Sequence, residues 1–134
     1  MVTELRDEAI KAGKALAVGL DMHGIPIRVA MWNYDSDAER WMLILATPLV
    51  TTRGPLAVYQ AIQEHLKNNT AIHFEDISVV EPSDDDAAAV RKAESLTADS
   101  APVRLTVESV YGGYFDDLWV LLSQANPPKP RLRA

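Results

Sequence analysis

Cysteine is absent from this chain of 134 residues. Structural disulfides, thiolate nucleophiles and cysteine-ligated zinc are therefore excluded, and a reducing compartment is compatible with the sequence. No apolar run approaches the roughly 20 residues that a membrane-spanning helix needs. The charged start, Met-Val-Thr-Glu-Leu-Arg-Asp-Glu, lacks the apolar core of a signal peptide. We therefore expect a soluble, cytoplasmic protein with no membrane contact.

Positive charge is also scarce. Lysine and arginine number 13 against 19 acidic residues, which gives a formal net charge of −6. Proteins that bind a phosphate backbone usually carry a basic stripe. Here the basic cluster is Lys129, Arg131 and Arg133, in the proline-rich residues 127–134. We interpret this segment as a flexible C-terminal tail rather than as a nucleic-acid-binding arm.

Motifs of catalysis and metal binding are missing. The three histidines, His23, His65 and His73, lack the His-x-x-x-His spacing of a helical zinc site. No nucleophile elbow and no glycine-rich phosphate or dinucleotide loop occurs. The sequence therefore predicts no catalytic residue, no metal and no cofactor. An enzyme remains a third alternative, and its best acid–base candidates are the carboxylates Glu108, Asp116 and Asp117.

What the chain does contain is a regular alternation of helix and strand patterns. Residues 3–22 repeat apolar side chains at helical spacing, and a second helix is expected to begin at Gly54-Pro55. Residues 25–46 predict a β-hairpin, and residues 77–81 a short strand preceded by an extended piece at 72–74. The strand–helix–strand order from Trp41 to Val80 predicts a right-handed crossover between parallel strands.

A third helix is expected over residues 87–96, after the acidic run Ser83-Asp84-Asp85-Asp86. Aspartates at a helix start accept hydrogen bonds from free backbone amides and complement the helix dipole. We favour that capping role over a cation site, because a cation loop normally supplies several spaced oxygens and a glycine turn.

A second hairpin is expected around Gly112-Gly113, between residues 103–111 and 114–122. A two-residue turn there predicts that Val103 pairs with Leu122, Leu105 with Val120, and Val107 with Leu118, with all six on one face. The same register places Glu108 opposite Asp117, which is unfavourable for two like charges.

Both hairpins have apolar side chains on both faces, whereas a sheet with one solvated face usually alternates apolar and polar residues. We expect helices to cover one face. The aromatic residues of the other face form a protein interface, line a ligand cleft or are buried within the single chain, and we favour the interface. Tyrosine and tryptophan are enriched in protein interfaces, because they combine a large apolar area with a polar group. The candidate interface or ligand-binding residues are Trp32, Tyr34, Met42, Ile44, Phe115, Trp119 and Leu121.

These patterns predict a single α+β domain over residues 1–126, in the order αββαβαββ. The sheet is expected to be mixed, mostly antiparallel and of about five strands, with helices packed on one face. The leading functional hypothesis is a non-catalytic interaction protein, a small acidic homodimer that associates through a sheet face and binds another protein. The alternative is a small-molecule-binding, sensor-like domain. The hairpin motifs Trp-Asn-Tyr-Asp and Arg-Trp-Met-Leu loosely resemble the opening strands of GAF- or PAS-type sensory domains, which implies a ligand cleft near Trp32, Tyr34 and Trp41.

Overall fold

The computed structural model describes residues 5–35, 38–67, 71–84, 87–88, 90, 101–105 and 118–123. Its helices and strands follow one another as α1 (Asp7–Met22), β1 (Val29–Asp35), β2 (Arg40–Ala46), α2 (Leu49–Arg53), α3 (Pro55–Leu66), η1 (Phe74–Asp76), β3 (Ile77–Val80), β4 (Val103–Leu105) and β5 (Leu118–Ser123). The α+β class predicted from the sequence is confirmed.

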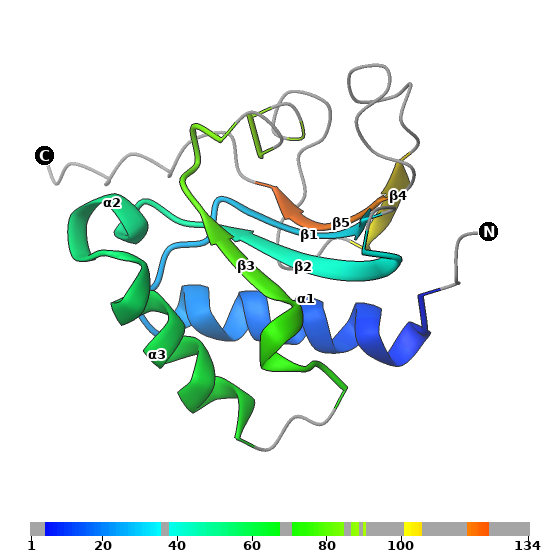
Figure 1. The fold of residues 1–134 in the computed structure, drawn as a ribbon, viewed down its shortest axis with the longest axis horizontal. Helices are drawn as coiled ribbons and strands as arrows, with labels where there is room; N and C mark the ends of the chain where they lie inside the picture. Colours follow the sequence, from blue (N-terminus) through cyan, green and yellow to red (C-terminus); the bar gives the residue numbers. More distant parts are fainter. Residues whose placement is uncertain are drawn as a thin grey trace, which may run out of the picture.

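The five strands form one mixed sheet in the order β3-β2-β1-β5-β4 (Figure 1). β1 pairs antiparallel with β2 and with β5, and β4 pairs antiparallel with β5. β2 and β3 are parallel, joined by a crossover through α2 and α3, as the sequence predicts. Pro55 occupies the first turn of α3, where its missing N–H leaves no bond unmade.

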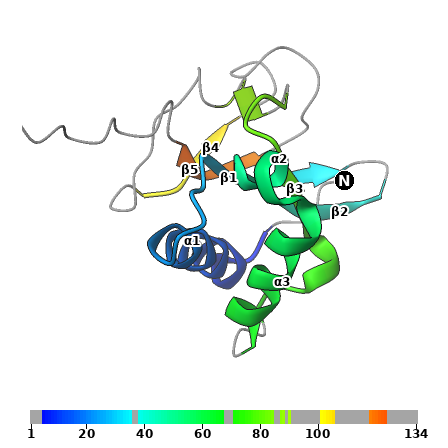
Figure 2. The same cartoon turned by 90° about the vertical axis from the view of Figure 1, so that its left-hand side faces the viewer.

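Both long helices pack on one face of the sheet (Figures 1 and 2). We call this the helix face and the opposite side the second face. From α1 come the buried Ile10, Leu16, Ala17 and Leu20, and from α3 come Val58 and Ile62. They meet alternate side chains of the central strands, Ala30, Trp32, Tyr34, Trp41, Leu43 and Leu45. One continuous core therefore lies between the helices and the sheet.

Gly13 allows α1 to lie close to the sheet. A Cβ atom at this position would lie 2.7 Å from Trp32 Nε1 and 2.9 Å from Leu121 Cδ1, too close for either atom to stay where it is. The indole N–H of Trp32 donates a 3.0 Å hydrogen bond to the Ala9 carbonyl, one turn earlier in α1. A tryptophan buried in this way usually finds a partner for its N–H, and here the helix backbone supplies it.

A β-bulge interrupts the pairing of β5 with β1. Ala30 pairs with Leu122 but Met31 pairs with Val120, so Leu121 is the extra residue. Its carbonyl accepts a 2.7 Å hydrogen bond from the Lys14 ammonium group of α1. The bulge places both Leu121 and Leu122 in the core of the helix face.

The pairs predicted for the second hairpin are wrong, because β5 is displaced by two residues from its predicted position along β4. β4 and β5 pair as Val103 with Val120, Arg104 with Trp119, and Leu105 with Leu118. The prediction assumed an unbroken alternation through Leu122, whereas the bulge moves Leu122 to the other face. The Gly112-Gly113 turn, the Glu108–Asp117 pair and residues 127–134 lie outside the described residues.

Two local predictions can also be compared with the structure. The extended piece expected at 72–74 is wrong, because Phe74 begins the short 3-10 helix η1 and its ring packs against Tyr59 of α3. Of the acidic run, Asp84 accepts a hydrogen bond from the Ala87 backbone N–H (3.4 Å), which agrees with the capping role. Asp85, Asp86 and most of the helix expected over 87–96 lie outside the described residues.

Candidate functional site

The expected aromatic interface lies mostly under the helices. Trp32 is 3% exposed, Tyr34 7% and Leu121 0%, and all three belong to the core beneath α1. Trp119 is half-buried against the same core, with the Arg104 guanidinium 5.8 Å from its ring centre. The prediction grouped these residues on one face correctly but assigned the helices to the wrong face. The close approach of α1 at Gly13 and the bond from Trp32 to Ala9 explain why the aromatic face is the covered one.

Met42 and Ile44 lie on the second face. Their cross-strand neighbours in β1 are Asn33 and Met31, and Ile44 also pairs with Ser78 in β3. The structure therefore separates these two candidates from the aromatic ones. Phe115, the remaining candidate, lies outside the described residues.

Part of the second face is covered by the chain itself. Five strand residues there are fully buried: Val29, Met31, Ala46, Leu118 and Val120. Ala87 and Val90, which follow the acidic run, are buried in the same cluster. The cover that Ala87 and Val90 give to this face was not predicted, because a thin apolar stripe after an acidic run gives no indication of which surface it meets.

Beside this covered part lies a strip of half-buried side chains that runs across β1, β2 and β3. We call it the β1–β3 strip; its members are Asn33, Met42, Ile44 and Ser78. None of the four carries a charge, in a chain whose formal net charge is −6. An uncharged strip with two large apolar side chains is suited to contact with another surface.

Asn33 is one of the two polar members of the strip, together with Ser78. Its neighbours across the sheet are Met42 in β2 and Leu118 in β5. The amide oxygen, Asn33 Oδ1, is buried and accepts no hydrogen bond from the residues that the structure describes. Leaving a buried acceptor unpaired costs about 1–3 kcal/mol. A group of this kind in a folded chain calls for an explanation.

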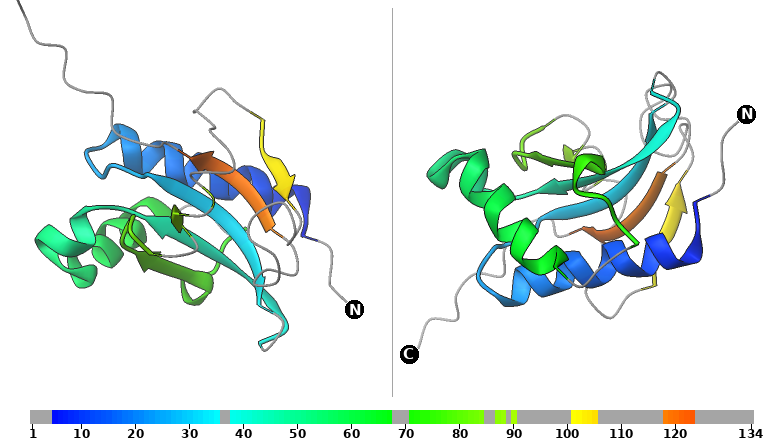
Figure 3. Two further views of the ribbon diagram at one scale, coloured as in Figure 1. Left: turned by 90° about the horizontal axis from the view of Figure 1, so that it is seen from above. Right: turned by 60° about the horizontal axis from the view of Figure 1, so that its bottom comes forward.

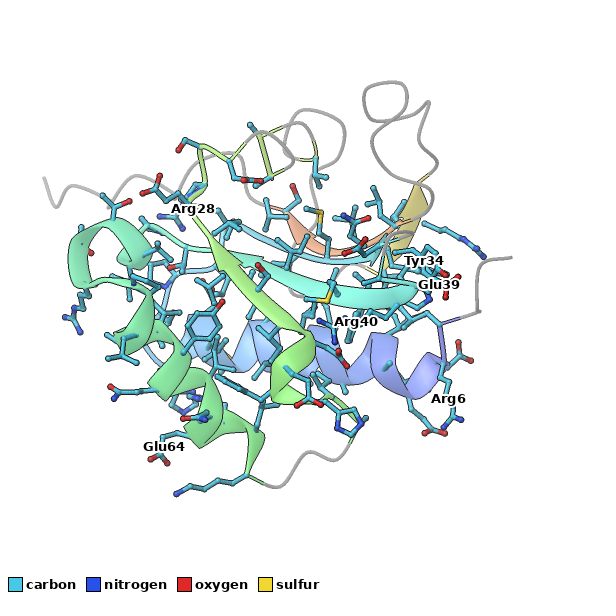
Figure 4. The ribbon with its side chains drawn as sticks, viewed as in Figure 1. Arg6, Arg28, Tyr34, Glu39, Arg40 and Glu64 are labelled. Carbon is cyan, nitrogen blue, oxygen red and sulfur yellow. The ribbon has the colours of Figure 1, made fainter. Side chains whose placement is uncertain are left out.

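The aromatic residues do not form the cleft that a sensor-like domain requires. Tyr34 and Trp41 face each other across β1 and β2, with ring centres 5.4 Å apart and an edge-to-face geometry. Together with Trp32 they are each at least nine-tenths buried in the helix-face core. A hollow of about 550 Å³ lies instead along the outer side of α3, where Glu64 projects (Figure 4), and its lining is Gln60, Ala61, Gln63, Glu64 and Lys67. One helix forms this lining, and four of its five residues have polar or charged side chains.

Two histidines meet where α1 passes α3. His23 is the C-terminal cap of α1, and His65 lies in the last turn of α3. Their ring centres are 5.1 Å apart, with the ring planes at 70°. The pattern of the sequence did not reveal this pair, because the two residues come from separate helices. His73 lies before η1 and is exposed.

The candidate acid–base carboxylates Glu108, Asp116 and Asp117 lie outside the part of the chain that the structure describes. Among the residues that the structure describes, no three His, Asp or Glu side chains come together as a metal-binding group. The described Arg40–Asp76 ion pair, with 3.2 Å between Nη1 and Oδ1, links the start of β2 to η1.

Comparisons with known proteins assign the chain to no family. No protein-family model matches the chain, and searches of curated proteins and of solved structures find no significant match. Of the helices that the structure describes, none combines the length and the apolar character that a membrane crossing demands.

Proposed function

We propose that this protein is a non-catalytic interaction module that forms a homodimer through the β1–β3 strip and binds a further protein as a dimer. The observation that supports this most directly is the unpaired oxygen of Asn33 within an uncharged, half-buried surface. Rotation of the partly exposed amide would bring this oxygen to the surface, where a donor from a second molecule could meet it.

A second copy of the chain suits this surface in its chemistry. A side-chain amide offers both a donor and an acceptor, so two Asn33 amides related by a twofold axis can satisfy each other. The absence of charge on the strip removes the local repulsion that two acidic molecules would otherwise experience. Buried asparagines are known to fix the register of apolar interfaces in this way.

The outer edge of the sheet at β3 is less suitable for pairing with a second copy. The backbone N–H of Val79 already donates a 3.0 Å hydrogen bond to the hydroxyl of Tyr59 in α3. An edge strand whose outward N–H is occupied is a poor template for another strand. This favours association through the face over association through the β3 edge.

The test is the solution mass, measured by light scattering after size exclusion over a wide concentration range. We expect a mass near twice 14.8 kDa. Ile44→Asp should give a monomer, because it places a carboxylate in the strip. Leu56→Asp makes the same kind of change at a residue of α3 that is 70% exposed, and this control should stay dimeric.

A further variant separates loss of the dimer from loss of the fold. Ser78→Arg adds a bulky charge to the strip without removing apolar area, and it should give a folded monomer by circular dichroism. A wild-type mass near 14.8 kDa at every concentration would refute the homodimer. A folded Ser78→Arg variant that keeps the mass of a dimer would refute this face as the interface.

A further inference from the structure

The histidine pair has properties that the proposed interaction does not use. α1 and α3 lie side by side beneath the sheet (Figure 3), and the His65 ring packs over Gly19, whose missing Cβ would lie 3.7 Å from His65 Cδ2. His23 is exposed and His65 is half-buried, so both rings can be reached from solvent.

Both imidazoles are oriented by their own helices. His23 Nδ1 lies 2.7 Å from the Gly19 carbonyl oxygen, and His65 Nδ1 lies 3.0 Å from the Ala61 carbonyl oxygen. A carbonyl can only accept, so each Nδ1 is the protonated donor, and each neutral ring carries its free lone pair on Nε2. Histidines that bind metals are typically fixed in this manner, with the non-binding nitrogen donating to a backbone carbonyl.

The separation of the rings also fits a shared metal ion. With a zinc–nitrogen bond of about 2.0–2.1 Å, and the ring centre about 1.1 Å beyond Nε2, two imidazoles at a tetrahedral angle have centres about 5.2 Å apart. At a right angle the corresponding separation is about 4.5 Å. The observed 5.1 Å equals, within about 0.1 Å, the tetrahedral value for two rings whose Nε2 atoms both point to the ion.

We propose that His23 and His65 bind a divalent transition-metal ion of the zinc class through their Nε2 atoms. In the described part of the chain no third His, Asp or Glu joins them, so water completes the coordination. Imidazole is a ligand that zinc and its neighbours in the first transition series accept readily. A bound ion would tie the C-terminal end of α1 to the last turn of α3.

Titration of the metal-free full-length protein with ZnCl₂ by isothermal calorimetry tests this proposal. We expect one ion per chain. His23→Gln and His65→Gln should each weaken binding by about tenfold or more, because removal of even an outer-shell partner costs 10–100-fold. His73→Gln is the matched control, since it removes an exposed histidine outside the pair, and it should bind zinc as the wild type does.

Spectra of the imidazole nitrogens provide a readout that a merely structural role would not change. Zinc should shift the resonances of His23 and His65 together and leave those of His73 in place. The proposal is overturned if the wild type binds no zinc, or if His73→Gln weakens binding as much as the other two variants. A folded His23→Gln protein with unchanged zinc affinity would overturn it equally.

Discussion

The two faces of the sheet bury similar apolar side chains but differ in the hydrogen bonding of their buried polar atoms. On the helix face, the Trp32 indole N–H donates to Ala9 and the Lys14 ammonium donates to the carbonyl freed by the bulge at Leu121. On the second face, the oxygen of Asn33 is buried with no donor among the described residues. In this part of the chain, the buried polar atoms of the helix face named above have partners, whereas Asn33 Oδ1 on the second face has none.

The two faces also differ in how closely they are packed. On the helix face, α1 approaches until only glycine fits at position 13. On the second face, the chain buries Val29 and Met31 with Ala87 and Val90, yet Met42 and Ile44 stay half-exposed. These two large apolar side chains lie partly uncovered beside a buried core. Such a surface is typical of a contact site for a second molecule.

The largest expected effect is the loss of stability when a side chain of the helix-face core is truncated, and a neighbour on the second face provides the comparison. Leu43→Ala and Ile44→Ala delete the same number of carbon atoms from β2. Leu43 is 0% exposed in the helix-face core, so its truncation should lower the free energy of unfolding by about 2–5 kcal/mol. Ile44→Ala should cost about 1 kcal/mol in dilute protein, because a half-buried side chain loses less contact. Urea unfolding of the monomer measures both values, and equal costs would contradict the comparison.

The next largest effect concerns the close contact between α1 and the sheet at Gly13. Gly13→Ala should lower the free energy of unfolding by about 1–3 kcal/mol, because the new methyl group collides with Trp32 and Leu121. Gly19→Ala lies on the same helix, but its Cβ meets only His65 at an ordinary contact distance of 3.7 Å. That variant should gain up to about 1 kcal/mol from helix propensity. Thermal unfolding of the two proteins side by side checks the opposite signs. If Gly13→Ala is as stable as Gly19→Ala, the close approach of α1 does not limit this site.

Much of the fold could be predicted because it depends on local patterns. The hairpin of β1 and β2, the proline at the start of α3 and the parallel crossover to β3 follow from alternation, turn chemistry and the handedness of connections. The grouping of Trp32 with Trp119 on one face follows from the two-residue period of a strand.

The choice of the covered face could not be predicted, because it depends on contacts between distant segments. A hydrogen bond from Trp32 to Ala9 and a glycine opposite the indole ring decide it, and neither is visible in a single strand pattern. The bulge at Leu121 escaped prediction for a similar reason, since the Leu121 carbonyl accepts a hydrogen bond from Lys14 of α1. The histidine pair joins residues 42 positions apart in separate helices, so no spacing rule within one helix could reveal it.

The smallest expected effect tests the unmet hydrogen bond of the second face directly. In dilute protein, Asn33→Leu should raise the free energy of unfolding by about 1 kcal/mol, because it removes an unsatisfied buried oxygen and adds apolar contact with Met42 and Leu118. The same variant should weaken the proposed dimer by about tenfold, since the paired amides would be lost. Ser78→Ala is the control, because Ser78 lies on the same strip without a buried unpaired atom, and its stability should change by less than about 0.5 kcal/mol. Denaturant unfolding at low concentration and light scattering at high concentration separate the two effects of Asn33→Leu. A loss of stability in dilute protein would mean that the Asn33 amide is already satisfied within one chain, and the main reason to assign a partner to the second face would disappear.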